Sequence, residues 1–125
     1  MRNFLFGFTL IYGCLVGNVT MANGTQKSMS MTTQNSKVTI RLAGSGTAII
    51  DWGDGIKSVT RELSPDLEIR TDFNDYNHTY SDKSYHTINI RGQIITHIDC
   101  NQNQLTNLDV SKNEILTYLE CSGNK

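Results

Sequence analysis

The feature that most constrains the fold is a residue pattern that occurs three times between residues 95 and 124. Each copy places two aliphatic residues three positions apart, then Cys or Val two positions later, then Asn three positions after that. We call the copies the first, second and third frames; their pattern residues are Ile95, Ile98, Cys100, Asn103, then Leu105, Leu108, Val110, Asn113, then Leu116, Leu119, Cys121, Asn124. Repetition in register predicts a solenoid in which equivalent positions of successive turns stack.

Each position of a frame has an expected structural role. Residues such as Ile98 and Cys100, two positions apart, share one side of an extended strand, so we expect them to face inward. The Asn that follows can both donate and accept, so we expect it to satisfy backbone groups left open where the chain turns out of the strand. Cys100 and Cys121 occupy the position of Val110, which favours free, small apolar side chains. A disulfide between them is the alternative, because adjacent parallel strands place equivalent Cα atoms about 4.8 Å apart.

The N-terminal residues have the composition of a secretory signal. Arg2 precedes an apolar run over residues 4–16, and small residues stand at positions −3 and −1 of a cleavage site after Ala22. The apolar run is shorter than the roughly 20 residues needed to span a membrane. We therefore expect a signal peptide over residues 1–22, with a lipoprotein signal modified at Cys14 as the alternative.

A polar segment and a region of short strands follow. Residues 23–36 show no periodicity and are expected to form a flexible leader. Over residues 37–92, apolar residues alternate with polar ones and tight turns intervene, which predicts a small antiparallel β-sandwich. Its strands include segments over residues 56–60 and 67–70. The residues expected to face its core are Val38, Ile40, Leu42, Ile50, Trp52, Ile88 and Ile90.

The segment Asp51-Trp52-Gly53-Asp54-Gly55 is expected to be a structural hairpin, because Asp-Gly suits a type I′ turn. Asp51 and Asp54 are interpreted as turn residues that accept backbone N–H bonds, and the alternative is a Ca²⁺ site completed by Asp72 or Asp75. Trp52 is interpreted as a core aromatic residue, and the alternative is an exposed sugar platform.

Two resemblances bear on the fold. The hairpin segment, together with His78-Thr79-Tyr80 and the strand Tyr85-His86-Thr87-Ile88-Asn89-Ile90, resembles a PKD-type immunoglobulin-like domain. The frames, with Leu-Asp-Val-Ser-Lys-Asn over residues 108–113, are similar to leucine-rich repeat proteins exported by Bacteroidetes, in which a small WGDG-containing domain leads directly into such repeats. The resemblances imply a PKD-like sandwich over residues 37–92 that leads into leucine-rich repeats over residues 93–125. Because residues 88–95 continue without a linker and the first coil of a solenoid has an apolar end that needs a cap, we expect the sandwich to cap the array.

Two frames make one coil of the expected solenoid, so three frames amount to about one and a half coils. About three repeats are needed for stability. We therefore expect an incomplete array, from a fragment of a longer repeat protein. The alternative is a short protein that closes its open end on a partner.

Composition and spacing argue against several functions. The chain carries 11 basic and 12 acidic residues, and the basic residues are scattered, so we expect no nucleic-acid partner. The spacing of the histidines fits no common metal motif, and no nucleophile–base–acid arrangement stands out. We expect no catalytic residues, no cofactor, no metal and, after signal cleavage, no membrane span.

The spacer residues of the first frame form the candidate ligand surface, because solenoids use such positions for recognition; these are Thr96, His97, Asp99, Asn101 and Gln102. We expect a secreted or cell-surface binding or adhesion module whose ligand is a protein or a glycan. The alternative is a non-catalytic, carbohydrate-binding accessory region of a larger secreted enzyme. Fold alone does not decide between them.

The signal peptide gives a direct test. Export is expected to remove residues 1–22, so N-terminal sequencing of the exported protein should begin at Asn23. A first residue that is a lipid-modified Cys14 would contradict this expectation.

Overall fold

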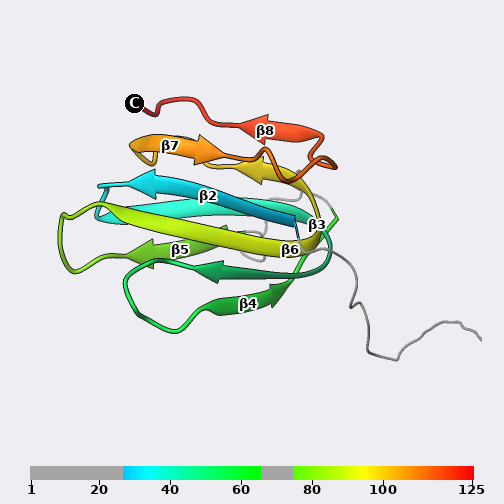
Figure 1. The fold of residues 1–125 in the computed structure, drawn as a ribbon, viewed down its shortest axis with the longest axis horizontal. Coiled ribbons are helices and arrows are strands. Elements are labelled where there is room, and N and C mark those ends of the chain that lie inside the picture. The colour runs from blue at the N-terminus through cyan, green and yellow to red at the C-terminus, as the bar shows by residue number, and fades with distance from the viewer. Residues whose placement is uncertain (1–26, 66–74) are drawn as a thin grey trace, which may run out of the picture.

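The structure, a computed structural model, describes residues 27–65 and 75–125. Within these residues the protein is all-β, and seven strands form one sheet (Figure 1). The strands are β2 (Lys27–Thr33), β3 (Lys37–Asp51), β4 (Val59–Glu62), β5 (Asp75–Thr79), β6 (His86–Asp99), β7 (Leu105–Asp109) and β8 (Tyr118–Glu120). None of the described segments is a helix with the length and apolar character needed to cross a membrane. The expected signal peptide and the strand expected over residues 67–70 lie outside the described residues.

Two long strands, β3 and β6, organise the sheet because each has different neighbours along its length. β6 pairs antiparallel with β2 and β3, and its last residues pair in parallel with β8. β3 pairs with β5 over residues 37–41 and with β4 over residues 47–50. Between these two segments the register of β3 against β6 shifts. Irregularities of this kind bend a strand, so the two ends of β3 can pair with different strands.

β2 overturns the prediction of a flexible leader for residues 27–33. This strand lies between β6 and β7 and pairs antiparallel with both. Met29, Met31 and Thr33 are buried because they occupy every second position and share one face. Methionine and serine are not typical strand residues, so the composition of this segment does not predict a strand.

The expected boundary between residues 92 and 93 falls inside β6, which runs without interruption from His86 to Asp99. Along one edge β2 pairs with β6 as far as Gly92, and along its other edge it pairs with β7. β2 therefore contacts strands from both sides of the expected boundary. One buried cluster contains side chains from both sides of this position, among them Ile90 and Ile98. The two predicted regions therefore share one sheet and one core.

The core confirms the inward positions predicted from alternation. The residues expected to face inward are each at most 1% exposed; they are Val38, Ile40, Leu42, Ile50, Trp52, Ile88 and Ile90. The first frame adds Ile95, Ile98 and Cys100, which are fully buried. The third frame differs from expectation, because Leu119 is 41% exposed and Cys121 is exposed. Among the described strands β8 pairs only with β6, so little covers the side chains at this edge.

The loop after β3 is longer than the predicted two-residue hairpin. β3 ends at Asp51, and β4 begins at Val59 rather than at residue 56. Gly53 and Gly55 have φ values of 79° and 83°, but Asp54 is not among the residues with positive φ. A type I′ turn needs positive φ at both central residues, so that prediction is wrong.

The turn chemistry predicted for the two aspartates is confirmed. The carboxylate of Asp51 accepts the N–H of Gly53 at 3.0 Å, and that of Asp54 accepts the N–H of Ile56 at 3.1 Å. Asp54 also pairs with Nε2 of His78 at 2.7 Å. Burial acts to raise the pKa of Asp54, but the hydrogen bonds from His78 and Ile56 outweigh it and hold the pKa below its usual range.

Trp52 is a core residue, as predicted, and not a surface platform. It is 1% exposed, and its ring stacks on that of His78 with centroids 4.7 Å apart. Its carbonyl oxygen accepts the hydroxyl of Tyr80 at 2.7 Å. The Trp and His-Thr-Tyr segments therefore pack together at one end of the core.

The two glycines of this loop form a matched pair for a stability test. Gly53→Ala is expected to lower the free energy of unfolding more than Gly55→Ala does. Both positions have left-handed φ, which costs a residue with a Cβ about 1–2 kcal/mol. At Gly53 the new Cβ would also collide with the carbonyl oxygen of Thr87, whereas nothing lies within 4 Å at Gly55. Urea unfolding measures both variants, and equal losses would contradict this close approach of the loop to β6.

Candidate functional site

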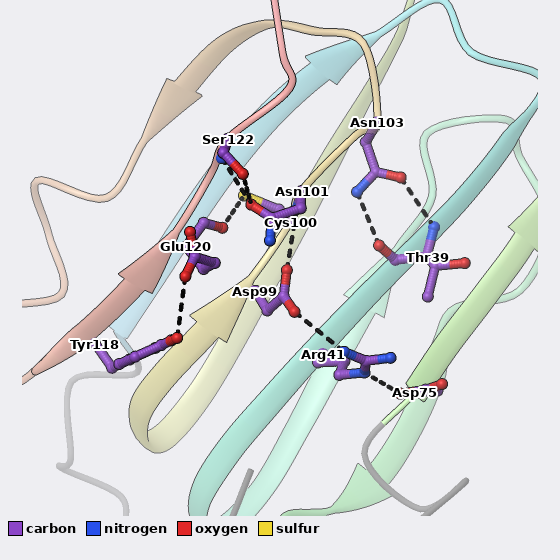
Figure 2. Close-up of polar contacts among 10 residues, drawn as sticks. All are labelled: Thr39, Arg41, Asp75, Asp99, Cys100, Asn101, Asn103, Tyr118, Glu120 and Ser122. Atoms are coloured by element: carbon purple, nitrogen blue, oxygen red, sulfur yellow. Dashed lines mark hydrogen bonds and ion pairs between the residues drawn. The ribbon is translucent and has the colours of Figure 1, made fainter. Parts of the chain in front are cut away.

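The candidate site lies on a polar face formed by β5, β3, β6 and β8 (Figure 2). The strand register places four charged residues in one row across these strands: Asp75, Arg41, Asp99 and Glu120. A second row lies beside it: Asn77, Asn101 and Ser122 come two residues after Asp75, Asp99 and Glu120, and Thr39 comes two residues before Arg41 on the antiparallel strand β3. We call these eight residues the polar face.

Arg41 lies between two carboxylates at the centre of this face. Its Nε donates to Asp75 at 2.6 Å and its Nη1 donates to Asp99 at 3.2 Å. The hydrogen bond to Asp75 raises the pKa of Arg41 against the opposing effect of burial, so the guanidinium remains charged. These bonds fix its orientation, while the side chain is still 27% exposed to solvent.

Asn101 links β6 to the segment that follows β8. Its Oδ1 accepts the backbone N–H and the hydroxyl of Ser122 at 2.6 and 3.1 Å. Its own N–H donates to Asp99 at 3.1 Å. The next residue, Gln102, has a φ of 55° and an exposed side chain. The chain therefore turns sharply beside a fixed amide and a fixed carboxylate.

A hollow of about 300 Å³ opens on this face, and its lining residues are Thr39, Arg41, Asp99, Asn101 and Gln102. The structure thus brings together three of the five residues predicted as a ligand surface, namely Asp99, Asn101 and Gln102. Thr39 and Arg41 were missed, because they belong to β3 and lie far from the frames in the chain. The alternation of β3 does place both of them on the face opposite the buried residues, and this pattern in the sequence could have indicated that they face the solvent.

The other two predicted residues, Thr96 and His97, do not line the hollow. The hydroxyl of Thr96 hydrogen-bonds to Nδ1 of His97 at 2.8 Å. The ring of His97 stacks on that of Tyr118 with centroids 5.5 Å apart. Tyr118 is 45% exposed, and its hydroxyl donates to Glu120 at 3.1 Å. An aromatic pair therefore lies on the same side of β6 and β8 as the hollow.

The asparagines of the frames hold the backbone behind the hollow. The Asn103 side chain accepts the N–H of Thr39 at 3.0 Å and donates to its carbonyl at 2.8 Å (Figure 2). The Asn124 side chain accepts the N–H groups of Asn103 and Leu105 at 2.9 and 3.0 Å, and donates to the carbonyl of Cys100 at 3.1 Å. The predicted role of these two residues is confirmed.

Asn113 fills that role only in part. It is 4% exposed, and its Nδ2 donates to the carbonyl of Ile95 at 3.0 Å. Its Oδ1 is buried and has no hydrogen-bond partner among the residues that the structure describes.

The two cysteines of the frames are free thiols in different environments. Cys100 is fully buried, whereas Cys121 is exposed. Burial raises the pKa of Cys100 to about 12, with smaller contributions from Cys121 and Asp99. Among the described residues, no group of three or more His, Cys, Asp or Glu side chains is arranged to hold a metal ion.

Comparison of the chain with protein-family models, with curated proteins and with solved structures finds no match in any of the three.

The environments of the cysteines predict selective alkylation. In the native protein at pH 8, iodoacetamide is expected to modify Cys121 readily and Cys100 only after unfolding, because the thiolate is the nucleophile. Peptide mapping by mass spectrometry locates the label, and the variants Cys100→Ser and Cys121→Ser each report on one thiol. Protection of both residues until a reductant is added would show a disulfide and contradict this assignment.

Proposed function

We propose that this chain is a non-catalytic binding module that is secreted or acts at the cell surface, and that it binds a protein or glycan ligand through the polar face. The observation that carries this proposal is the hollow between β3 and the first frame, where donors and acceptors are held in place before any ligand arrives. Preorganised groups lose little conformational freedom on binding. The signal-like N-terminus supports export, and no enzymatic activity is assigned.

We further infer that the fold combines a PKD-like β-sandwich with the first coils of a leucine-rich repeat solenoid. Two observations support the repeat part of this inference. β6 and β8 pair in parallel with His97 opposite Tyr118, so the first and third frames lie in register. In addition, Asn124 bonds to the backbone of the first frame as Asn103 bonds to Thr39. β3 thus occupies, beside the first frame, the position that a preceding coil would occupy.

The proposal can be tested by removing one charge from the hollow. Asp99→Asn keeps the shape of the side chain but weakens its pairing with Arg41 and with any ligand donor. A hydrogen bond to a charged group is worth about 1.5–3 kcal/mol, so binding is expected to weaken about tenfold or more. Asp109→Asn is the matched control, because Asp109 has the equivalent position in the second frame and lies on β7.

The measurement uses arrays of glycans and of extracellular proteins probed with the exported protein and both variants. At least one array component is expected to bind the unaltered protein and the Asp109 variant but to bind the Asp99 variant weakly. Binding that both variants retain equally would place the ligand elsewhere and overturn the proposal.

A further inference from the structure

Resting on the proposed function, we propose that the hollow lined by Thr39, Arg41, Asp99, Asn101 and Gln102 is a subsite for one ring of a neutral oligosaccharide. The proposal specifies the ligand as uncharged and rich in hydroxyl groups. It follows from the charge balance of the polar face, the chemistry of the lining groups and the aromatic pair beside them.

The charges of the polar face disfavour an anionic ligand. Three carboxylates, those of Asp75, Asp99 and Glu120, lie in one row with a single guanidinium. Arg41 already donates to two of these carboxylates. A phosphate, sulfate or uronate group would have to compete with these bonds and approach a face of net negative charge.

A cationic ligand is disfavoured at the hollow itself. Arg41 lines the hollow and carries a fixed positive charge. The carboxylate of Asp99 is partly satisfied by Arg41 and by the N–H of Asn101. Because the charges at the hollow compensate one another, a ligand charge of either sign gains little there and loses its hydration.

Hydroxyl groups match the lining residues. A hydroxyl can donate one hydrogen bond and accept two. The hollow offers a carboxylate as acceptor, a guanidinium as donor and the Gln102 amide, which can do both. The Thr39 hydroxyl donates to Oδ1 of Asn77 at 2.7 Å and is left as an acceptor. The bond of Arg41 to Asp75 fixes the guanidinium, and the bond from Ser122 fixes the amide of Asn101, which also lines the hollow. Such a set suits the closely spaced hydroxyls of a sugar ring.

The aromatic pair formed by His97 and Tyr118 indicates that a bound sugar chain would extend along β6. His97 and Tyr118 lie on the same side as Asp99 and Asn101, because they alternate along the two strands. Asn101 is four positions after His97 and two after the end of β6, which corresponds to about 13 Å of extended chain. The exposed Tyr118 ring can pack against the apolar face of a sugar, so a longer chain could contact both places.

Calorimetric titration of the exported protein tests the proposal. The neutral probes are maltohexaose, cellohexaose and mannohexaose; hexagalacturonate and hexalysine are the charged comparators. We expect a neutral probe to bind with an affinity that changes less than about twofold between low and high salt, because no ion pair is formed with it. Amide chemical-shift changes at Thr39, Asn101 and Gln102 would locate the bound sugar.

Two glutamines provide matched variants. Gln102→Ala is expected to weaken binding about fivefold, the effect of one lost hydrogen bond. Gln104→Ala should leave binding unchanged; Gln104 also has a left-handed φ and an exposed side chain but does not line the hollow. Tyr118→Ala should reduce the affinity for a bound hexasaccharide more than that for the corresponding disaccharide.

The outcomes separate this inference from the proposed function. Salt-sensitive binding of hexalysine or hexagalacturonate at the hollow, without neutral binding, would overturn the sugar proposal and leave a binding module. If a component of the array binds in a way that depends on Asp99 but no neutral probe binds, the sugar proposal is again overturned and the binding module remains. A neutral probe that binds Gln102→Ala and the unaltered protein equally would also overturn the proposal. Failure of all probes, together with array binding insensitive to Asp99→Asn, would refute both proposals.

Discussion

The two hydrogen bonds between the side chain of Asn103 and the backbone of Thr39 are the interaction on which the remaining structure depends. One amide satisfies both the N–H and the C=O of a residue within β3. The carbonyl of Asn103 in turn accepts the hydroxyl of Thr33 at 2.6 Å in a buried site. A single residue of the first frame is therefore bonded to β3 and to the end of β2. Buried polar groups without such partners would cost about 1–3 kcal/mol each.

Asn124 repeats this interaction one step further along. Its side chain bonds to the backbone of Cys100, Asn103 and Leu105, as Asn103 bonds to Thr39. The same chemistry thus connects the third frame to the first frame and the first frame to β3. Because the amide is planar and both of its ends are used, the spacing between successive segments is fixed. This is why the hollow combines residues from β3 with residues from the first frame.

The sequence predicted the local features and missed those that depend on pairing. Alternation placed Ile40, Ile50 and Trp52 in the core, and the asparagine pattern anticipated the roles of Asn103 and Asn124. The strand β2 was missed, because its alternation uses methionine and becomes meaningful only when β6 and β7 flank it. The length of the loop after β3 was also missed, since Asp-Gly favours a tight turn locally while the pairing of Ile50 with Val59 leaves a longer connection.

For the candidate site, the frame pattern identified Asp99, Asn101 and Gln102, but it could not identify Thr39 or Arg41. Their place beside the first frame follows from the antiparallel register of β3 against β6, with Arg41 opposite Asp99. Register between strands far apart in the sequence is set by burial of a whole face and is not visible in any short segment. Residues contributed by a single strand were therefore predictable, and the composition of the hollow was not.

Hydrogen exchange at the Thr39 amide tests the central claim most directly, because this N–H donates to the side chain of Asn103. The amide can be followed by nuclear magnetic resonance in Asn103→Ala and in Asn77→Ala, which removes the other side-chain partner of Thr39. We predict that Thr39 exchanges much faster in Asn103→Ala, relative to the core amides of Ile40 and Ile90, and retains its protection in Asn77→Ala. Equal protection of Thr39 in both variants would contradict the account, since β3 would then be held without the asparagine.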